Sequence, residues 1–205
     1  MLKSLIKRIF GPKSTKAFKP DGFLVATIND KILPIDRGEV YEDPLDEYLK
    51  QRGFGEVTGG GTLQLESGEI KDCDVEIYLD DEPIDQKTIN DIITFLEGLG
   101  VPKGSSLLIV KSNERIPFGQ REGLGIYLDG ANLPGNVYKE CDSNFVMKEL
   151  KKLTKDENEI YRYWEAPSVT AMYFYGNSYE EMDNAIKKFV IEYPLCRNAK
   201  IQRIA

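Results

Sequence analysis

Acidic side chains alternate with apolar ones along one short segment of the sequence, residues 72–80. One tyrosine joins the acidic positions: Asp72, Asp74, Glu76, Tyr78 and Asp80. The positions between them hold Cys73, Val75, Ile77 and Leu79. Because successive side chains of a β-strand point to opposite faces of a sheet, the alternation predicts a strand with one apolar face and one acidic face.

A second segment, residues 56–66, is expected to pair with this strand through a hairpin turn at residues 67–69. Its own alternation predicts that Leu63 and Leu65 face the core and that Glu66 joins the acidic side. Carboxylates held this close together destabilise a sheet mildly, so the cluster calls for an explanation.

Three interpretations of the acidic face remain open. It could be a landing surface for a basic protein, with Tyr78 as the kind of aromatic contact that is enriched at interfaces. It could instead hold a divalent cation between carboxylates. It could also be the solvated face of an acidic protein, since isolated surface charges cost little.

Catalytic chemistry has few candidates because the sequence contains no histidine. This excludes Ser-His-Asp and Cys-His arrangements and histidine-containing zinc sites. Acid–base candidates are pairs of carboxylates: Asp74 with Glu76, and Asp80 with Asp81 and Glu82. Cys141 or Cys196 could be a nucleophile only with a lowered pKa. Since no converging set of groups is visible around them, we expect no catalysis, no cofactor and no bound metal.

The three cysteines indicate a reducing compartment. Cys73, Cys141 and Cys196 are an odd number, are widely spaced and form no Cys-x-x-Cys pair, which is typical of free thiols. No apolar run approaches the roughly 20 residues of a membrane-spanning helix. The N-terminal residues lack the apolar stretch and cleavage site of a secretory signal. We therefore expect a cytoplasmic protein.

A glycine run, Thr58-Gly59-Gly60-Gly61-Thr62, has two interpretations. Consecutive backbone amides can form a nest for an anion such as phosphate. No Gly-Lys-Ser/Thr follows the run, however, and a strand rather than a helix is expected after it. Glycines inside a strand more often mark a bulge or a close approach of two backbones, and we favour that structure here.

Aromatic residues mark the corresponding hairpin of the second half of the chain. One expected strand contains Tyr161, Tyr163 and Trp164, and the next contains Tyr173, Phe174 and Tyr175. Aromatic rings on an open sheet are a feature of RNA-recognition modules, but the basic residues that accompany them there are missing from residues 170–175, and the body of the chain is acidic. We expect packing between the two halves, and we include Tyr161 and Tyr163 among the candidate contacts of a protein partner.

Charge is distributed unevenly along the chain. Residues 1–20 hold six basic residues and no acid: Lys3, Lys7, Arg8, Lys13, Lys16 and Lys19. The remainder has 21 basic against 34 acidic residues, a formal charge of about −13. Such a body repels nucleic acid and attracts basic proteins. The basic leader has Leu2, Leu5, Ile6 and Ile9 at helical spacing. This suits a helix that docks on a membrane surface or on a partner, without stable membrane insertion, or a frayed or loosely docked terminus, which we favour.

The order of expected elements is the same in both halves of the chain. In the first half, strands are expected at 23–28, 56–66, 73–79 and 105–110, and helices at 44–52 and 85–99. In the second, strands are expected at 123–128, 160–164, 169–175 and 200–204, and helices at 144–153 and 179–191. The pattern predicts an α+β fold of two tandem ferredoxin-like βαββαβ units at 21–118 and 119–205, after a leader at 1–20. Each antiparallel sheet would carry its helices on one face and leave the other open.

Three segments carry a resemblance to small acidic bacterial proteins that are encoded beside polymorphic toxins: Gly53–Thr62, Cys73–Ile77 and Gly100–Ser105. The resemblance covers mainly residues 22–135. Proteins of that group are often immunity proteins, which bind and block a toxin. The resemblance therefore implies such a role here, and it assigns no role to an individual residue.

The resulting hypothesis is a non-catalytic binding protein, an immunity protein that blocks a basic toxin domain. Its expected contacts are Glu66, Asp72, Asp74, Glu76, Tyr78, Asp80, Tyr161 and Tyr163. One alternative is a ligand-sensing regulatory module with a cleft between the two units, near Gly59–Thr62. A second alternative is an enzyme that uses carboxylates or Cys196 in a deep cleft.

Overall fold

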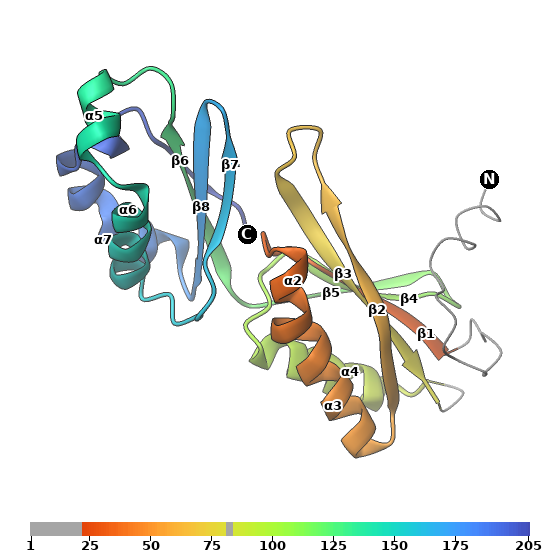
Figure 1. The fold of residues 1–205 in the computed structure, drawn as a ribbon. Coiled ribbons are helices and arrows are strands. Elements are labelled where there is room, and N and C mark those ends of the chain that lie inside the picture. Colours follow the sequence, from red (N-terminus) through yellow and green to blue (C-terminus); the bar gives the residue numbers. More distant parts are fainter. Residues whose placement is uncertain (1–21, 81–83) are drawn as a thin grey trace.

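Each half of the chain folds into an antiparallel sheet with its helices packed on one face (Figure 1). The structure is a computed structural model and describes residues 22–80 and 84–205. The first half contains β1 (Phe23–Ile28), α2 (Pro34–Arg37), a π-helical segment η3 (Gly38–Glu42), α3 (Asp43–Arg52), β2 (Gly55–Gln64), β3 (Ile70–Leu79), α4 (Gln86–Gly98), β4 (Ser105–Ile109) and β5 (Glu114–Phe118). The second contains β6 (Glu122–Asp129), α5 (Gly135–Glu140), α6 (Ser143–Thr154), β7 (Arg162–Ala166), β8 (Val169–Gly176), α7 (Tyr179–Glu192), a 3-10 turn η4 (Pro194–Cys196) and β9 (Lys200–Arg203).

The strand orders are those of two ferredoxin-like units. The first sheet runs β2-β3-β1-β4-β5 and the second runs β7-β8-β6-β9, with every neighbouring pair antiparallel. In each sheet the first strand of the unit lies between the third and the fourth, as in the split βαβ arrangement. The expected α+β class with tandem ferredoxin-like units is confirmed.

One strand, β5, extends the first sheet beyond the expected four. Residues Glu114–Phe118 pair with β4 along its whole length, after a turn in which Asn113 has a φ of 56°. The run is only five residues long and contains Pro117, which lacks a backbone donor and weakens the strand pattern in the sequence. An edge position tolerates such a residue, and the structure places it there.

Helical structure begins earlier in the first unit than the sequence pattern indicates. The helix expected at residues 44–52 begins ten residues earlier, because residues 34–52 form one continuous helical stretch of α2, η3 and α3. Pro34 occupies the first turn of α2, where its missing donor costs nothing and its fixed φ suits a helix. The segment ends at Gly53, which has a φ of 66° and caps the helix as a left-handed residue.

Two parts of the sequence analysis fall outside the described residues. These are the basic leader, residues 1–20, and the carboxylates Asp81 and Glu82. Within residues 22–80 and 84–205, every helix falls short of the length and apolar character that crossing a bilayer needs.

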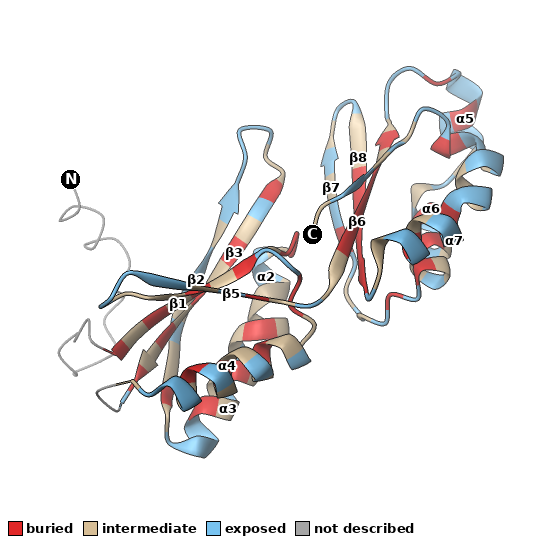
Figure 2. Ribbon diagram, turned by 180° about the vertical axis from the view of Figure 1, so that it is seen from behind, coloured by how far each residue is buried: buried red, intermediate tan, exposed pale blue. Residues whose placement is uncertain are grey.

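Each sheet is held to its helices by a hydrophobic core of its own. In the first, Leu24, Val75 and Ile77 from the sheet pack with Leu45 of α3 and Ile92 of α4. In the second, the core residues of the sheet are Leu124, Ile126, Met172 and Phe174, and those of the helices are Val146 and Ile186. Burying one such side chain contributes about 1.5 to 3 kcal/mol. Figure 2 shows the buried residues along the central strands and on the helix faces turned toward them.

A third buried cluster joins the two units. It lies on the helix-free face of the second sheet and is built on Ala171, Tyr173 and Tyr175 of β8. The hydroxyls of Tyr173 and Tyr127 both donate to Glu69 Oε1 of the β2–β3 turn, at 2.8 and 3.0 Å. The hypothesis that aromatic residues of the second hairpin pack between the units is confirmed for Tyr173 and for Tyr175, whose hydroxyl accepts from the Lys31 backbone N–H at 3.0 Å. The second sheet therefore has no open face in this region.

A buried ion pair lies at the centre of the contact between the units. Arg162 of β7 donates from Nε to Oδ1 of Asp30 at 2.7 Å and from a terminal nitrogen to Oδ2 at 2.9 Å. The Tyr41 hydroxyl donates to the same carboxylate at 2.7 Å, and the guanidinium carbon lies 5.4 Å from the ring centroid of Tyr175. The side chains of Asp30 and Arg162 are 0% and 3% exposed, so the pair is almost fully desolvated.

Removing one member of this pair is expected to destabilise the protein strongly. Arg162→Ala leaves the Asp30 carboxylate buried without its cation, and the free energy of unfolding should fall by about 3 to 5 kcal/mol. Urea denaturation followed by circular dichroism measures the loss. The matched control is Arg203→Ala, whose half-exposed side chain pairs with Glu180, and a loss of at most about 1 kcal/mol is expected there. Equal losses in the two variants would contradict this account of the contact.

Candidate functional site

The acidic alternation of the sequence lies on β3, the second strand of the first sheet. Asp72, Asp74, Glu76 and Tyr78 are half-buried, while the residues between them are buried against the helices. The sequence prediction of a strand with an apolar core face and an acidic outer face is therefore confirmed. The outer face of this sheet is the one opposite α3 and α4 (Figure 1).

Neighbouring strands add apolar residues to the same face. Val25 of β1 lies opposite Glu76 on one side and Leu108 of β4 on the other. Thr27 lies opposite Asp74 in the same way. We call this surface the acidic sheet face and define it by its members: Val25, Thr27, Asp72, Asp74, Glu76, Tyr78 and Leu108. An apolar strip thus borders a row of carboxylates.

The carboxylates of this face are incompletely compensated. Burial raises the pKa of Glu76 above its usual range, and the nearby carboxylates of Asp74 and Glu42 raise this pKa further. One oxygen of Asp74, Oδ1, is buried and has no hydrogen-bond partner among residues 22–80 and 84–205. Asp72 has a lysine, Lys71, at 3.5 Å, but no Lys or Arg of the described residues forms an ion pair with Asp74 or Glu76. The face therefore presents negative charge that the described part of the fold does not neutralise.

Glu66 and Asp80 lie beyond the ends of the paired strands. Glu66 is exposed in the turn between β2 and β3, so it is not in the ladder that carries the other carboxylates. Asp80 follows β3 directly and donates its backbone N–H to the Phe54 carbonyl at 2.9 Å. The structure thus brings together four of the six expected residues of the first unit, and it places these two at the margins.

The prediction that Leu63 and Leu65 face the core is wrong, since their side chains are 50% and 44% exposed. The strand pairing has an irregularity between Val57 and Gly59, so one extra residue enters β2. Because side chains alternate with a period of two, one inserted residue exchanges the two faces of everything that follows. Leu63 consequently lies opposite Asp72, on the outer face.

The glycine run is explained by this irregular strand. Gly59 has a φ of 153°, and a side chain at Gly60 would lie only 2.3 Å from the Asp74 carbonyl oxygen. Beside it, Arg37 donates to Thr62 Oγ1 at 2.8 Å and to Glu42 at 2.5 Å. The expectation of a bulge and a close approach of two backbones is confirmed.

Tyr161 and Tyr163 lie away from the acidic sheet face. Tyr163 is opposite Met172, so it is on the helix-bearing side of the second sheet, and both tyrosines are about two-fifths exposed, at 44% and 42%. Together with Met147 of α6 they line a shallow pocket of about 220 Å³. The Lys151 amine lies 4.8 Å from the Tyr161 ring centroid. The two tyrosines would have to contact a different part of any partner.

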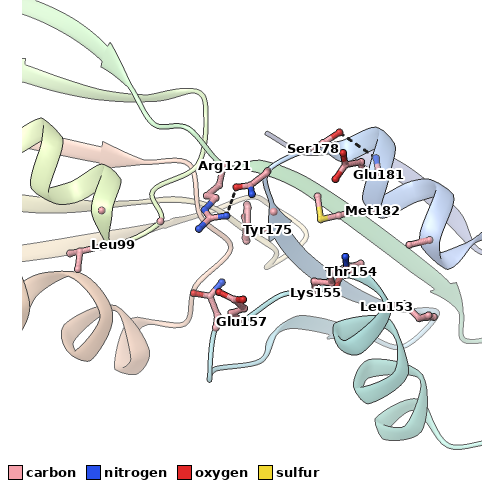
Figure 3. A pocket seen from close by; sticks show the side chains of 16 residues that line it. Leu99, Arg121, Leu153, Thr154, Lys155, Glu157, Tyr175, Ser178, Glu181 and Met182 are labelled. Atoms are coloured by element: carbon pink, nitrogen blue, oxygen red, sulfur yellow. Dashed lines mark hydrogen bonds between the residues drawn. The ribbon is translucent and has the colours of Figure 1, made fainter.

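A larger pocket of about 490 Å³ lies between the units, where the end of α4 approaches the end of α6 and the start of α7 (Figure 3). Arg121 lies in it and donates to the Asn177 side chain. Lys155 and Glu157 come from the end of α6, and Glu181 comes from α7. The sequence alternative of a cleft between the units thus has a counterpart, but at these helix ends and not at residues 59–62.

The two buried thiols, Cys73 and Cys196, are poor nucleophiles at neutral pH. Burial raises the pKa of Cys196 to about 11, and burial also raises the pKa of Cys73 well above its usual range. Both thiols therefore stay protonated, whereas a nucleophile needs the thiolate. In the part of the chain that the structure describes, no three Cys, Asp or Glu side chains converge as a metal site would require.

Comparisons with known proteins give distant structural likenesses. No protein-family model matches the chain, and no curated protein matches it. Among solved structures, a proposed monooxygenase from Lactobacillus acidophilus NCFM is similar over 89% of this chain and 93% of that one, with 11% identity and a TM-score of 0.29. An unknown protein from Galdieria sulphuraria is similar over 88% and 95%, with 16% identity and a TM-score of 0.26. Likenesses of this degree carry no argument about function.

The raised pKa of Glu76 predicts a pH dependence of stability. A carboxyl whose folded-state pKa lies above its usual value, 4.5, keeps its proton longer in the folded state than in the unfolded one. Stability from this group is therefore lost as the pH rises through that range. Glu76→Gln should be more stable than the parent at neutral pH, by less than about 1 kcal/mol because the group is half exposed.

Denaturation curves between about pH 4 and pH 7 test this expectation. The gain of Glu76→Gln should shrink toward the acidic end, where the parent carboxyl is protonated. Glu159→Gln, at an exposed loop position, is the matched control and should show no such trend. A gain that is the same at every pH would contradict a titrating Glu76.

Proposed function

We propose that this protein is a non-catalytic binding protein whose acidic sheet face receives a cationic surface of another protein. In this proposal its biological role is that of a cytoplasmic immunity protein, and the partner is a bacterial toxin domain that it blocks sterically. The residues of the first contact are Asp72, Asp74, Glu76 and Tyr78. Glu66 and Asp80 would add charge at the margins of that contact.

The observation that supports this proposal most is the unequal use of the two sheets. The helix-free face of the second sheet is covered by the first unit, through Tyr173, Tyr175 and the ion pair of Arg162 with Asp30. The equivalent face of the first sheet carries adjacent carboxylates, one of which, Asp74, has a buried oxygen with no hydrogen-bond partner in the described part of the chain. If the helix-free face of the first sheet served only to pack the protein's own chain, adjacent carboxylates on it would bring a cost without a benefit.

A cationic partner would supply what this face lacks. A guanidinium or ammonium group could donate to Asp74 Oδ1 and neutralise Glu76, and hydrogen bonds to charged groups are stronger than neutral ones. Val25 and Leu108 offer apolar contact area beside the charges, and Tyr78 offers an aromatic one. The negative potential of the body would also speed the encounter at low salt.

The immunity role rests on the resemblance of Gly53–Thr62, Cys73–Ile77 and Gly100–Ser105 to proteins encoded beside polymorphic toxins. An inhibitor of that kind needs a rigid surface complementary to a toxin but no catalytic group. The rigid antiparallel sheet, and the buried, protonated state of Cys73 and Cys196, agree with a protein that acts by occupying a surface. Tyr161 and Tyr163 remain candidates for a second contact.

The neighbouring genes are first searched for a secreted protein with a variable C-terminal domain, and binding kinetics with that domain then test the proposal. The double variant Asp74→Lys/Glu76→Lys should slow association by at least about tenfold at low salt and flatten its salt dependence. The control Glu140→Lys/Glu192→Lys makes the same change in net charge at two exposed positions at the ends of α5 and α7. Equal slowing in both variants would assign the effect to net charge and remove the acidic sheet face from the proposal.

A second candidate function is the sensing of a small molecule in the pocket between the units. The observation in its favour is a volume of about 490 Å³ lined by both units, with Arg121 and Lys155 near Glu157 and Glu181. Cations and carboxylates around one pocket suit a small zwitterion such as a free amino acid. Pockets at the junction of two units are common ligand sites.

Thermal denaturation with a panel of free amino acids tests this second candidate. A ligand present at about 100 times its dissociation constant adds about 2.7 kcal/mol to stability, which is easily measured as a rise in Tm. Arg121→Gln should abolish the rise, and Arg115→Gln on β5, outside the pocket, should keep it. If no compound of the panel raises the Tm of the parent, this candidate is removed.

A further inference from the structure

We propose that the acidic sheet face has an occupant within the same chain, the basic leader of residues 1–20, which binds it when no partner is present. The inference concerns the same face as the proposed function and extends it. An external basic protein would then compete with the leader for the carboxylates of β3.

The acidic sheet face and the leader are chemically complementary. The acidic sheet face pairs an apolar strip, Val25 and Leu108, with a row of carboxylates on β3. The leader contains the opposite combination. Its apolar residues recur at helical spacing, and its charged residues are all basic: Leu2, Leu5, Ile6 and Ile9, with Lys3, Lys7, Arg8, Lys13, Lys16 and Lys19. An amphipathic basic segment matches a surface that is apolar on one side and acidic on the other.

The leader is attached to the first sheet close to the acidic sheet face. Gly22 directly precedes β1, and it lies against the backbone of Leu79, since a side chain there would be 2.4 Å from the Leu79 carbonyl oxygen. The leader therefore joins the first sheet at the Tyr78 end of β3. Glu76 and Asp74 lie two and four residues along this strand from Tyr78, about 7 and 13 Å at 3.3 Å per residue. A helix of twenty residues is about 30 Å long at 1.5 Å per residue, so the leader is long enough to reach both carboxylates.

Two carboxylates of the acidic sheet face lack a neutralising cation in the described part of the protein. Asp74 and Glu76 have no ion-pair partner among the described residues, and the pKa of Glu76 is raised by burial and by neighbouring carboxylates. Among the described cations, Lys71 lies 3.5 Å from Asp72 but forms an ion pair with neither Asp74 nor Glu76, and Arg115 of β5 lies across the sheet, opposite Leu108, where it donates to Ser106. A tethered segment reaches an effective concentration on the order of millimolar without any new binding energy. Six tethered cations are thus the readiest source of neutralisation for β3.

Carbodiimide coupling of the intact chain tests the inference, because it joins a lysine amine directly to a carboxylate and leaves no spacer. The reaction is run at low ionic strength on an equal mixture of unlabelled and nitrogen-15-labelled protein, and the linked peptides are identified by mass spectrometry. We expect links from leader lysines to Asp72, Asp74 or Glu76 within single chains. They should be at least about fivefold more frequent than links to Glu140 and Glu192, which are more exposed.

A charge-reversed leader, Lys7→Glu/Arg8→Glu/Lys13→Glu, is the matched variant and should lose the links from the remaining leader lysines to β3. Links that join labelled to unlabelled chains would show that the occupant is a second copy, and they would overturn the inference. Links spread evenly over all exposed carboxylates would overturn it as well. The result is independent of the proposed function, because a chain that shows these links but binds no cationic protein would keep the inference and lose that function.

Discussion

The bidentate ion pair of Asp30 with Arg162 is the interaction on which the arrangement of the two units depends. Asp30 follows β1 of the first unit and Arg162 begins β7 of the second, so one contact joins segments 132 residues apart. Both groups are desolvated, which makes the pair costly to break once formed but also specific in its geometry. By holding the second sheet against the first unit, it decides which of the two helix-free faces is covered.

The hairpin of β2 and β3 connects this contact with the acidic sheet face. At its turn, Glu69 accepts hydrogen bonds from Tyr127 and Tyr173 of the second unit. Farther along the same strand, Asp74 and Glu76 point to the outer face of the first sheet. The hairpin therefore presents carboxylates in two environments: Glu69 at the turn is hydrogen-bonded within the protein, whereas Asp74 and Glu76 in the middle of β3 have no ion-pair partner among the described residues. This contrast is the physical basis for treating the middle of β3 as a surface for another molecule.

Local patterns in the sequence predict the local part of this structure well. The alternation of residues 72–79 predicts both the strand and its two faces, because the period of two is a property of the backbone alone. The face of the sheet on which Leu63 lies is not predictable in this way, because the bulge after Val57 depends on the pairing register of β2 with β3. The partnership of Asp30 with Arg162 and the pocket at the helix ends near Arg121 depend on how two units dock. No pattern within a single segment of the sequence contains that information.

The additional strand β5 has a consequence for self-association. It covers the edge of β4 and becomes the border of the first sheet, where Pro117 and Arg115 are poor templates for another strand. The opposite border is β2, whose glycine run carries no side chains to obstruct an incoming strand. Strand-to-strand association through the first sheet would therefore begin at β2 and not at β5.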